Sequence, residues 1–184
     1  MNAITSFFLL AKHWQIFVLV CGTYLTGQIA IVSSLGLTPG PLKDPLRAGL
    51  YLGAVLLPFV VCFMGWLWSL GSFLSSIAEP SLRLNLHFFR FAILFSSLYL
   101  LTALPFFLSS NPTIEAIILP MHFLALVCLL YAFYFVSKSL VVAETGEAVT
   151  FNDYAISLLL FLCSFIGIWL IQPRINRLYA HRGT

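Results

Sequence analysis

The amino-acid sequence contains five stretches of at least 20 residues without a charged side chain. They cover residues 14–42, 48–78, 91–114, 116–137 and 154–173. A helix of about 20 apolar residues spans the hydrocarbon core of a bilayer, so each stretch is long enough to cross a membrane. The chain is only 8% charged, whereas soluble domains are about 25% charged. We therefore predict an all-α fold, a polytopic helical membrane protein.

We expect the 184 residues to form a single membrane domain that begins with an interfacial helix over about residues 2–14. Four firm transmembrane helices follow over about residues 16–37, 50–77, 86–108 and 113–137, and a fifth apolar helix covers about residues 155–171. Pro112 is predicted to begin the fourth span, and Gly146 to stop it. Thr150 and Asp153 match an acidic variant of the capping box, which predicts that the last helix begins there.

The fifth apolar segment leaves the topology open. Its 17 charge-free residues would form about 25 Å of helix, nearly the hydrocarbon thickness, which favours a full crossing. Five crossings place four basic residues on the amino-terminal side and five on the other, so the positive-inside rule then gives no orientation. The alternative is a re-entrant segment that breaks near Gly167, which changes the count to seven against two and makes both termini cytoplasmic. The seven are Lys12, Arg83, Arg90, Lys138, Arg174, Arg177 and Arg182, and the two are Lys43 and Arg47.

Arg90 is the one charge inside a long apolar run, about 6 Å along the third span from its start. We interpret it as a snorkelling side chain or as one partner of a structural ion pair. The functional alternative is an intramembrane ligand for an anion or a carboxylate, with Glu79, Glu144 and Asp153 expected on the same side of the membrane.

His122 follows Pro120 in the fourth span, and proline leaves helix carbonyls without their usual donors. We expect His122 to bond such a carbonyl, or Gln28 of the first span, rather than to relay protons. Tyr24 lies one turn before Gln28, and the two can join helices or line a polar path. His87 and His122 are expected at different depths, so they do not predict a shared haem.

Small residues recur every four positions along the first span, at Gly22, Thr26, Ala30 and Ser34. Such a stripe allows another helix to approach closely. We expect no catalytic residues, no metal and no cofactor, because the sequence lacks metalloprotease, hydrolase, P-loop and dinucleotide motifs. The basic residues lie at segment ends, where they act as topogenic signals, so we expect no nucleic-acid partner.

Five segments of the chain resemble an uncharacterised family of small multi-pass bacterial inner-membrane proteins. They are residues 12–17 (KHWQIF), 65–69 (GWLWS), 134–138 (YFVSK), 149–153 (VTFND) and 168–176 (IWLIQPRIN). The resemblance implies basic second and fourth loops and a proline where this chain has Phe165; the second loop here has Arg83 alone. It also favours a bacterial inner membrane with a cytoplasmic amino terminus, and somewhat favours a cytoplasmic carboxyl terminus. The family brings no activity to this chain.

Three functions are compatible with these features. We favour a structural or accessory subunit that packs in the lipid bilayer against itself or a larger membrane partner through the small-residue stripe. The alternative is a transport or channel component, in which Gln28, Tyr24, Arg90 and His122 line a polar route. An intramembrane enzyme is the least supported, because no nucleophile and base occur at a usable spacing.

Overall fold

The structure is a computed structural model and describes residues 3–37, 45–102 and 112–181. Every regular secondary-structure element within these ranges is a helix, which confirms the predicted all-α class there. The helices are α1 (Ala3–Leu10), α2 (His13–Leu37), α3 (Pro45–Ile77), α4 (Leu86–Thr102), α5 (Pro112–Thr145), α6 (Phe151–Leu162) and α7 (Ser164–Ala180), with a short 3-10 helix at Pro80–Leu82.

Three of these helices are long and apolar enough to span a membrane. Their candidate spans are His13–Ser33 in α2, Leu50–Ile77 in α3 and Ala116–Thr145 in α5. This is one fewer than the four firm spans predicted. α4 is described over 17 residues, and the remainder of the predicted span 86–108 lies outside the described residues.

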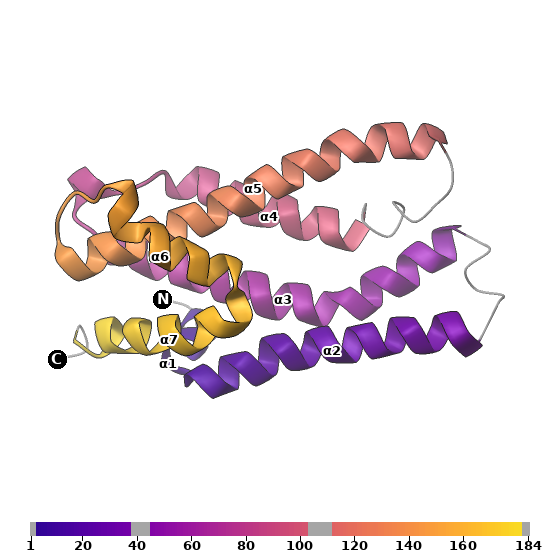
Figure 1. Cartoon of the computed structure of the whole chain (residues 1–184), viewed down its shortest axis with the longest axis horizontal. Helices are drawn as coiled ribbons and strands as arrows, with labels where there is room; N and C mark the ends of the chain where they lie inside the picture. Colours follow the sequence, from indigo (N-terminus) through magenta and orange to yellow (C-terminus); the bar gives the residue numbers. More distant parts are fainter. Residues whose placement is uncertain (1–2, 38–44, 103–111, 182–184) are drawn as a thin grey trace.

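α3 is the centre of the bundle, and it packs against α1, α2, α4 and α5. The four helices α2 to α5 run along the long axis of the molecule (Figure 1). In the core, the buried ring of Phe89 on α4 stacks on Phe135 of α5 with a centroid distance of 4.3 Å. Gly71 of α3 leaves room for this ring, because a Cβ added there would lie 2.4 Å from Phe89. A small residue on α3 therefore lets α4 approach closely.

The predicted interfacial helix over residues 2–14 is shorter than expected and is partly buried. α1 ends at Leu10 and α2 begins at His13, so the segment is divided. α1 packs against α3 and α7, and the side chains of Phe8 and Leu9 are buried in the core. The division has a local cause at the start of α2, where the Lys12 N–H donates to Gln15 Oε1 at 2.8 Å.

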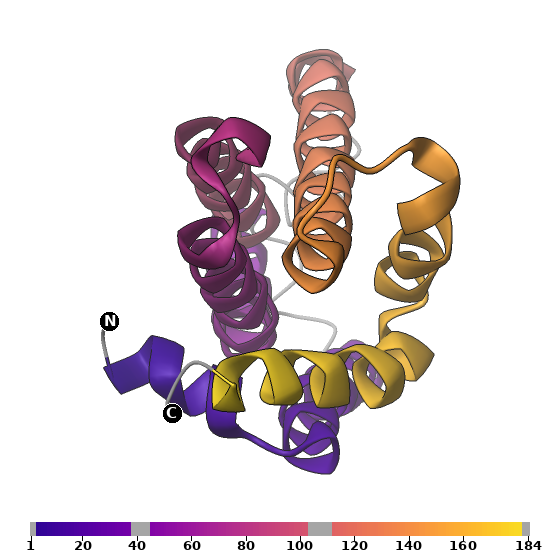
Figure 2. The same ribbon diagram turned by 90° about the vertical axis from the view of Figure 1, so that its left-hand side faces the viewer.

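The carboxyl-terminal apolar segment forms a helical hairpin rather than one straight helix. α6 ends at Leu162, Cys163 adopts φ −94° and ψ 55°, and α7 begins at Ser164. α7 returns to the end of the molecule that holds both termini (Figure 1), and it lies across that end when viewed along the bundle (Figure 2). Residues 155–171 therefore do not form the one continuous helix expected for a full crossing, and the break lies four residues before the position suggested at Gly167. Whether the segment crosses or re-enters the membrane stays a prediction.

The hairpin depends on a close approach of two backbones. A Cβ added at Gly167 would lie 1.8 Å from the carbonyl oxygen of Leu160, so only glycine fits there. The Cys163 carbonyl accepts hydrogen bonds from the N–H groups of Ile166 at 3.0 Å and Gly167 at 2.8 Å. Ser164 Oγ donates to the Phe161 carbonyl at 2.5 Å. These bonds pair backbone groups of the bend without water, as an apolar environment requires.

Candidate functional site

A buried polar contact centred on Gln172 joins α7 to α3 and α1. Gln172 Oε1 accepts a hydrogen bond from Trp66 Nε1 at 2.9 Å. The Gln172 Nε2 amide group donates to three oxygen atoms. They are the carbonyl oxygen of Phe8 at 2.8 Å, the carbonyl oxygen of Ala11 at 3.1 Å and Asn176 Oδ1 at 3.0 Å. Asn176 Nδ2 also donates to the Ala11 carbonyl at 3.2 Å. Carbonyls at a helix end lack intrahelical donors, so these two amides complete α1.

The spacing of the apolar residues of α7 is a sequence signal for this contact. Ile168, Ile171 and Ile175 of α7 are fully buried. Gln172 lies within their spacing of three and four residues, so it lies on the buried face of the helix. In the sequence it was considered only as part of the segment 168–176, one of the five that resemble the bacterial membrane family. A polar residue within an apolar helical stripe indicates instead a hydrogen-bonded contact inside the protein.

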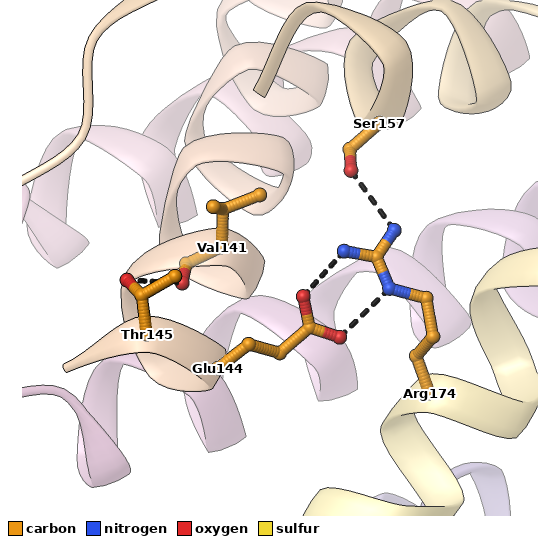
Figure 3. Close-up of polar contacts among 5 residues, drawn as sticks. All are labelled: Val141, Glu144, Thr145, Ser157 and Arg174. Carbon is orange, nitrogen blue, oxygen red and sulfur yellow. Dashed lines mark hydrogen bonds and ion pairs between the residues drawn. The ribbon is translucent and has the colours of Figure 1, made fainter. Parts of the chain in front are cut away.

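An ion pair holds α7 against the end of α5. Arg174 Nε donates to one carboxylate oxygen of Glu144 at 2.7 Å, and Arg174 Nη2 pairs with the other oxygen. Arg174 Nη1 donates to Ser157 Oγ of α6 at 3.0 Å, so the guanidinium joins α7 to both α5 and α6 (Figure 3). The two side chains are 23% and 28% exposed. Two parallel bonds between a guanidinium and a carboxylate fix orientation as well as charge.

The connection between α5 and α6 follows the predicted stop and start signals. α5 ends at Thr145, and Gly146 has a φ of 72°, which favours glycine. The Asp153 carboxylate accepts hydrogen bonds from the Thr150 N–H at 2.7 Å and the Thr150 hydroxyl at 2.8 Å, and α6 begins at Phe151. The predicted capping arrangement is therefore confirmed. The bond from the Thr150 backbone, and then that from its hydroxyl, lower the pKa of Asp153, which precedes the apolar segment.

Arg90 contacts an aromatic ring rather than a carboxylate. Its guanidinium carbon lies 5.4 Å from the centroid of the Trp68 ring on α3. Within the described ranges Arg90 forms no ion pair: Glu144 pairs with Arg174, and Asp153 caps α6. Of the two structural interpretations of Arg90, the described residues provide no ion-pair partner, so the snorkelling interpretation remains as a prediction. A guanidinium over an indole is attracted by the negative face of the ring, which partly replaces the missing carboxylate.

His122 pairs with Tyr99 of α4. Its Nδ1 lies 2.9 Å from the Tyr99 hydroxyl, and among the described residues no hydrogen bond joins His122 to Gln28, which was one of its two expected partners. Gln28 itself is half-buried and forms no side-chain hydrogen bond with the described residues. Arg90 and Tyr99 are nine residues apart on α4, which separates the Arg90 contact and the His122 contact by about 14 Å along the helix.

Tyr24 belongs to an aromatic cluster between α2, α3 and the hairpin. Its ring centroid lies 5.5 Å from that of Phe59 and 6.1 Å from that of Phe165. Phe165, at the position of the expected proline, thus packs at the hairpin bend. The four candidate polar residues therefore lie in separate contacts, and the described structure does not bring Arg90, His122, Gln28 and Tyr24 to one route.

The small-residue stripe of α2 faces largely away from the bundle. An added Cβ at Gly22 would have no neighbour within 4 Å, and Thr26 is exposed. Ala30 is half-buried, and its carbonyl accepts a hydrogen bond from the Tyr51 hydroxyl at 3.1 Å; the side chain of Ser34 lies outside the described residues. The packing of α2 on α3 uses Gly27 instead, where a Cβ would lie 3.4 Å from the Val55 carbonyl oxygen.

Comparisons of the chain with protein-family models, with curated proteins and with solved structures find no match. The resemblance of the five sequence segments to a bacterial membrane family stays a prediction. Chemically, the described site residues can hold helices together, and Arg90 offers an unpaired cation. They do not assemble a nucleophile with a base, and the described part of the chain has no group of three or more His, Cys, Asp or Glu side chains that would hold a metal.

Proposed function

We propose that the chain is a bacterial inner-membrane protein with four crossings and a re-entrant carboxyl-terminal hairpin. α2, α3 and α5 are three of the crossings, and the predicted span over about residues 86–108, which begins with α4, is the fourth. The return of α7 supports this topology, because it leaves both termini at one end of the bundle (Figure 1). That end then carries seven basic residues against two at the other, so the positive-inside rule favours cytoplasmic termini.

Within this topology, the protein acts as a structural or accessory subunit that packs through the outward face of α2 against a second copy or a larger membrane partner. The uncovered stripe at Gly22 and Thr26 is the observation that carries this proposal. Helix association in lipid depends on close backbone approach, since lipid supplies no hydrophobic driving force between helices. A face with a glycine that no described residue of the chain approaches is available for such an approach.

A transport route has less support. The polar residues that would line it are divided among an aromatic stack at Arg90, a Tyr99 pair at His122 and an aromatic cluster at Tyr24. The largest buried polar contact, at Gln172, fastens α1 and α3 to α7. Side chains used to hold helices together are not free to coordinate a passing solute.

The subunit proposal is tested by enlarging the stripe. Gly22→Leu and Thr26→Leu are expected to reduce self-association, measured as the detergent-solubilised mass by light scattering, or the recovery of a partner from native membranes. Ile156→Leu, at an exposed apolar position of α6 and away from α2, is the control and should leave both unchanged. Melting curves of each variant exclude unfolding as the cause. Unchanged mass and unchanged partner recovery in the folded Gly22 and Thr26 variants would contradict the proposal.

A further inference from the structure

Two buried side-chain polar atoms in the described part of the chain have no hydrogen-bond partner. They are Arg90 Nε and Ser72 Oγ. Trp68 and Ser72 are one helical turn apart on α3, so they lie on the same face of that helix, and the Arg90 guanidinium lies over the Trp68 ring. Buried polar groups are normally paired, and leaving a charged one unpaired is costly. Arg90 Nε, beside Trp68, therefore marks an incomplete polar site between α3 and α4.

The terminal nitrogens of Arg90 are also unpaired, but they are not buried. Neither forms a hydrogen bond with a described residue, and only Nε is enclosed. The neighbouring Arg83 differs, because its Nε donates to the Ala78 carbonyl at 2.9 Å and thereby completes the end of α3. Arg90 thus offers a planar, permanently charged edge with two accessible donors, which matches the geometry of a phosphate.

We propose that Arg90, stacked on Trp68, binds the phosphate of an anionic phospholipid headgroup. The inference rests on the proposed membrane topology, which places this end of α4 at the cytoplasmic leaflet. That leaflet carries anionic lipids, and basic residues near it are attracted to them. Arg90 is the fifth residue of α4, about 6 Å along the helix from its start, so its terminal nitrogens can reach headgroup level.

A lipid headgroup fits this site better than a carboxylate of the chain. Glu144 is held by Arg174, and Asp153 is held by Thr150. A soluble phosphate ion offers the same oxygens but lacks acyl chains, which would lie along the exposed apolar side chains of Phe91 and Leu94 on α4. Acyl-chain burial adds to the affinity of a lipid and not to that of a free ion.

The experiment measures lipid binding to the full chain in detergent by native mass spectrometry and by thermal shift. The probes are phosphatidylglycerol, phosphatidylcholine with the same acyl chains, and inorganic phosphate. The wild-type protein should bind phosphatidylglycerol more tightly than phosphatidylcholine. Arg90→Gln should weaken phosphatidylglycerol binding by roughly tenfold to a hundredfold, the loss expected for a charge-assisted hydrogen bond. Arg177→Gln, at an exposed position of α7, is the control and should bind like the wild type.

Equal binding of the two lipids by the wild type, or an unchanged preference in Arg90→Gln, would overturn the proposal. Displacement of the lipid by an equal concentration of inorganic phosphate would overturn the lipid assignment and leave a site for a free anion. If Arg90→Gln does not fold, Arg90→Lys keeps the charge but loses the planar fork, and it should show a smaller loss in the same direction. Light scattering of each variant measures self-association through α2, which does not depend on lipid binding at Arg90. A failure of the lipid proposal can therefore be told apart from a failure of the subunit proposal.

Discussion

Replacing Gly167 by alanine should open the carboxyl-terminal hairpin. The added Cβ would lie 1.8 Å from the Leu160 carbonyl oxygen, and ordinary contact begins at 3.4 Å, so α6 and α7 must separate by about 1.6 Å. Overpacking costs about 1–3 kcal/mol, and two backbones cannot rotate away from each other, so we take about 3 kcal/mol. Alanine favours the helix by about 1 kcal/mol relative to glycine, which offsets part of this cost. The net destabilisation is about 2 kcal/mol.

For a chain of this size, that loss corresponds to a fall in melting temperature of about 4–8 °C. The assay is thermal unfolding in a mild detergent, followed by the remaining monodisperse fraction. Gly22→Ala is the matched control, because it also removes a helical glycine but its Cβ meets nothing within 4 Å. It should melt at the wild-type temperature or slightly above. A Gly167→Ala protein as stable as the wild type would refute the close approach of the two helices.

Three further perturbations test the contacts of the hairpin. Gln172→Leu leaves the Trp66 indole N–H and a carbonyl of α1 without partners, which costs about 1–3 kcal/mol for each group. Trypsin should therefore cleave the α1–α2 junction faster than in the wild type. An unchanged cleavage rate would count against the docking of Gln172 on α1. A double-mutant cycle with Glu144→Gln and Arg174→Gln should give a coupling free energy of about 1 kcal/mol, since the pair is partly exposed. Additive effects of the two substitutions would show that the ion pair does not stabilise the fold. The pKa of Asp153 in the folded protein is lowered from 3.8, so the stabilisation that its carboxylate gives is present above pH 3.8 and is lost as the pH falls through the folded-state pKa. The difference in melting temperature between the wild type and Asp153→Asn should shrink over that pH range. A difference that does not depend on pH would contradict the cap.

Local sequence signals predicted the parts of the fold that depend on a few adjacent residues. Pro112 begins α5, Gly146 follows its end, and the Thr150–Asp153 cap starts α6. Each of these features follows from the backbone needs of the residues themselves: proline lacks an N–H, glycine tolerates positive φ, and a carboxylate accepts from free helix N–H groups. Hydrophobic length likewise predicted the spans in α2, α3 and α5.

The hairpin could not be predicted with the same certainty, because its cause is tertiary. Residues 155–171 are charge-free and contain no proline, so local preference allows a continuous helix. The turn at Cys163 is fixed by the fit of Gly167 against Leu160 and by the docking of Gln172 on α1, whose partners lie more than 150 positions away in the sequence. A single glycine in an apolar segment indicates a close approach only when the neighbour is known.

The sequence did not predict the partners of the candidate polar residues, for a related reason. Arg90 and His122 were singled out as costly residues inside apolar segments, but their partners depend on which helices are adjacent. α4 lies between α3 and α5, so Arg90 meets Trp68 and His122 meets Tyr99. Charge alone suggested carboxylate partners, whereas the carboxylate of Glu144 was taken by Arg174 from the hairpin. The hairpin therefore places Arg174 on Glu144 and removes that carboxylate from the partners expected for Arg90.

The side of the membrane on which the carboxyl terminus lies tests the account most directly. Green fluorescent protein, which fluoresces in the cytoplasm, and alkaline phosphatase, which is active only outside it, are fused separately to each terminus of the full chain. A hairpin that returns to the end holding the amino terminus predicts fluorescence and no phosphatase activity for fusions at both ends (Figure 1). Phosphatase activity at the carboxyl terminus together with fluorescence at the amino terminus would mean that the last segment crosses the membrane, and would contradict the account.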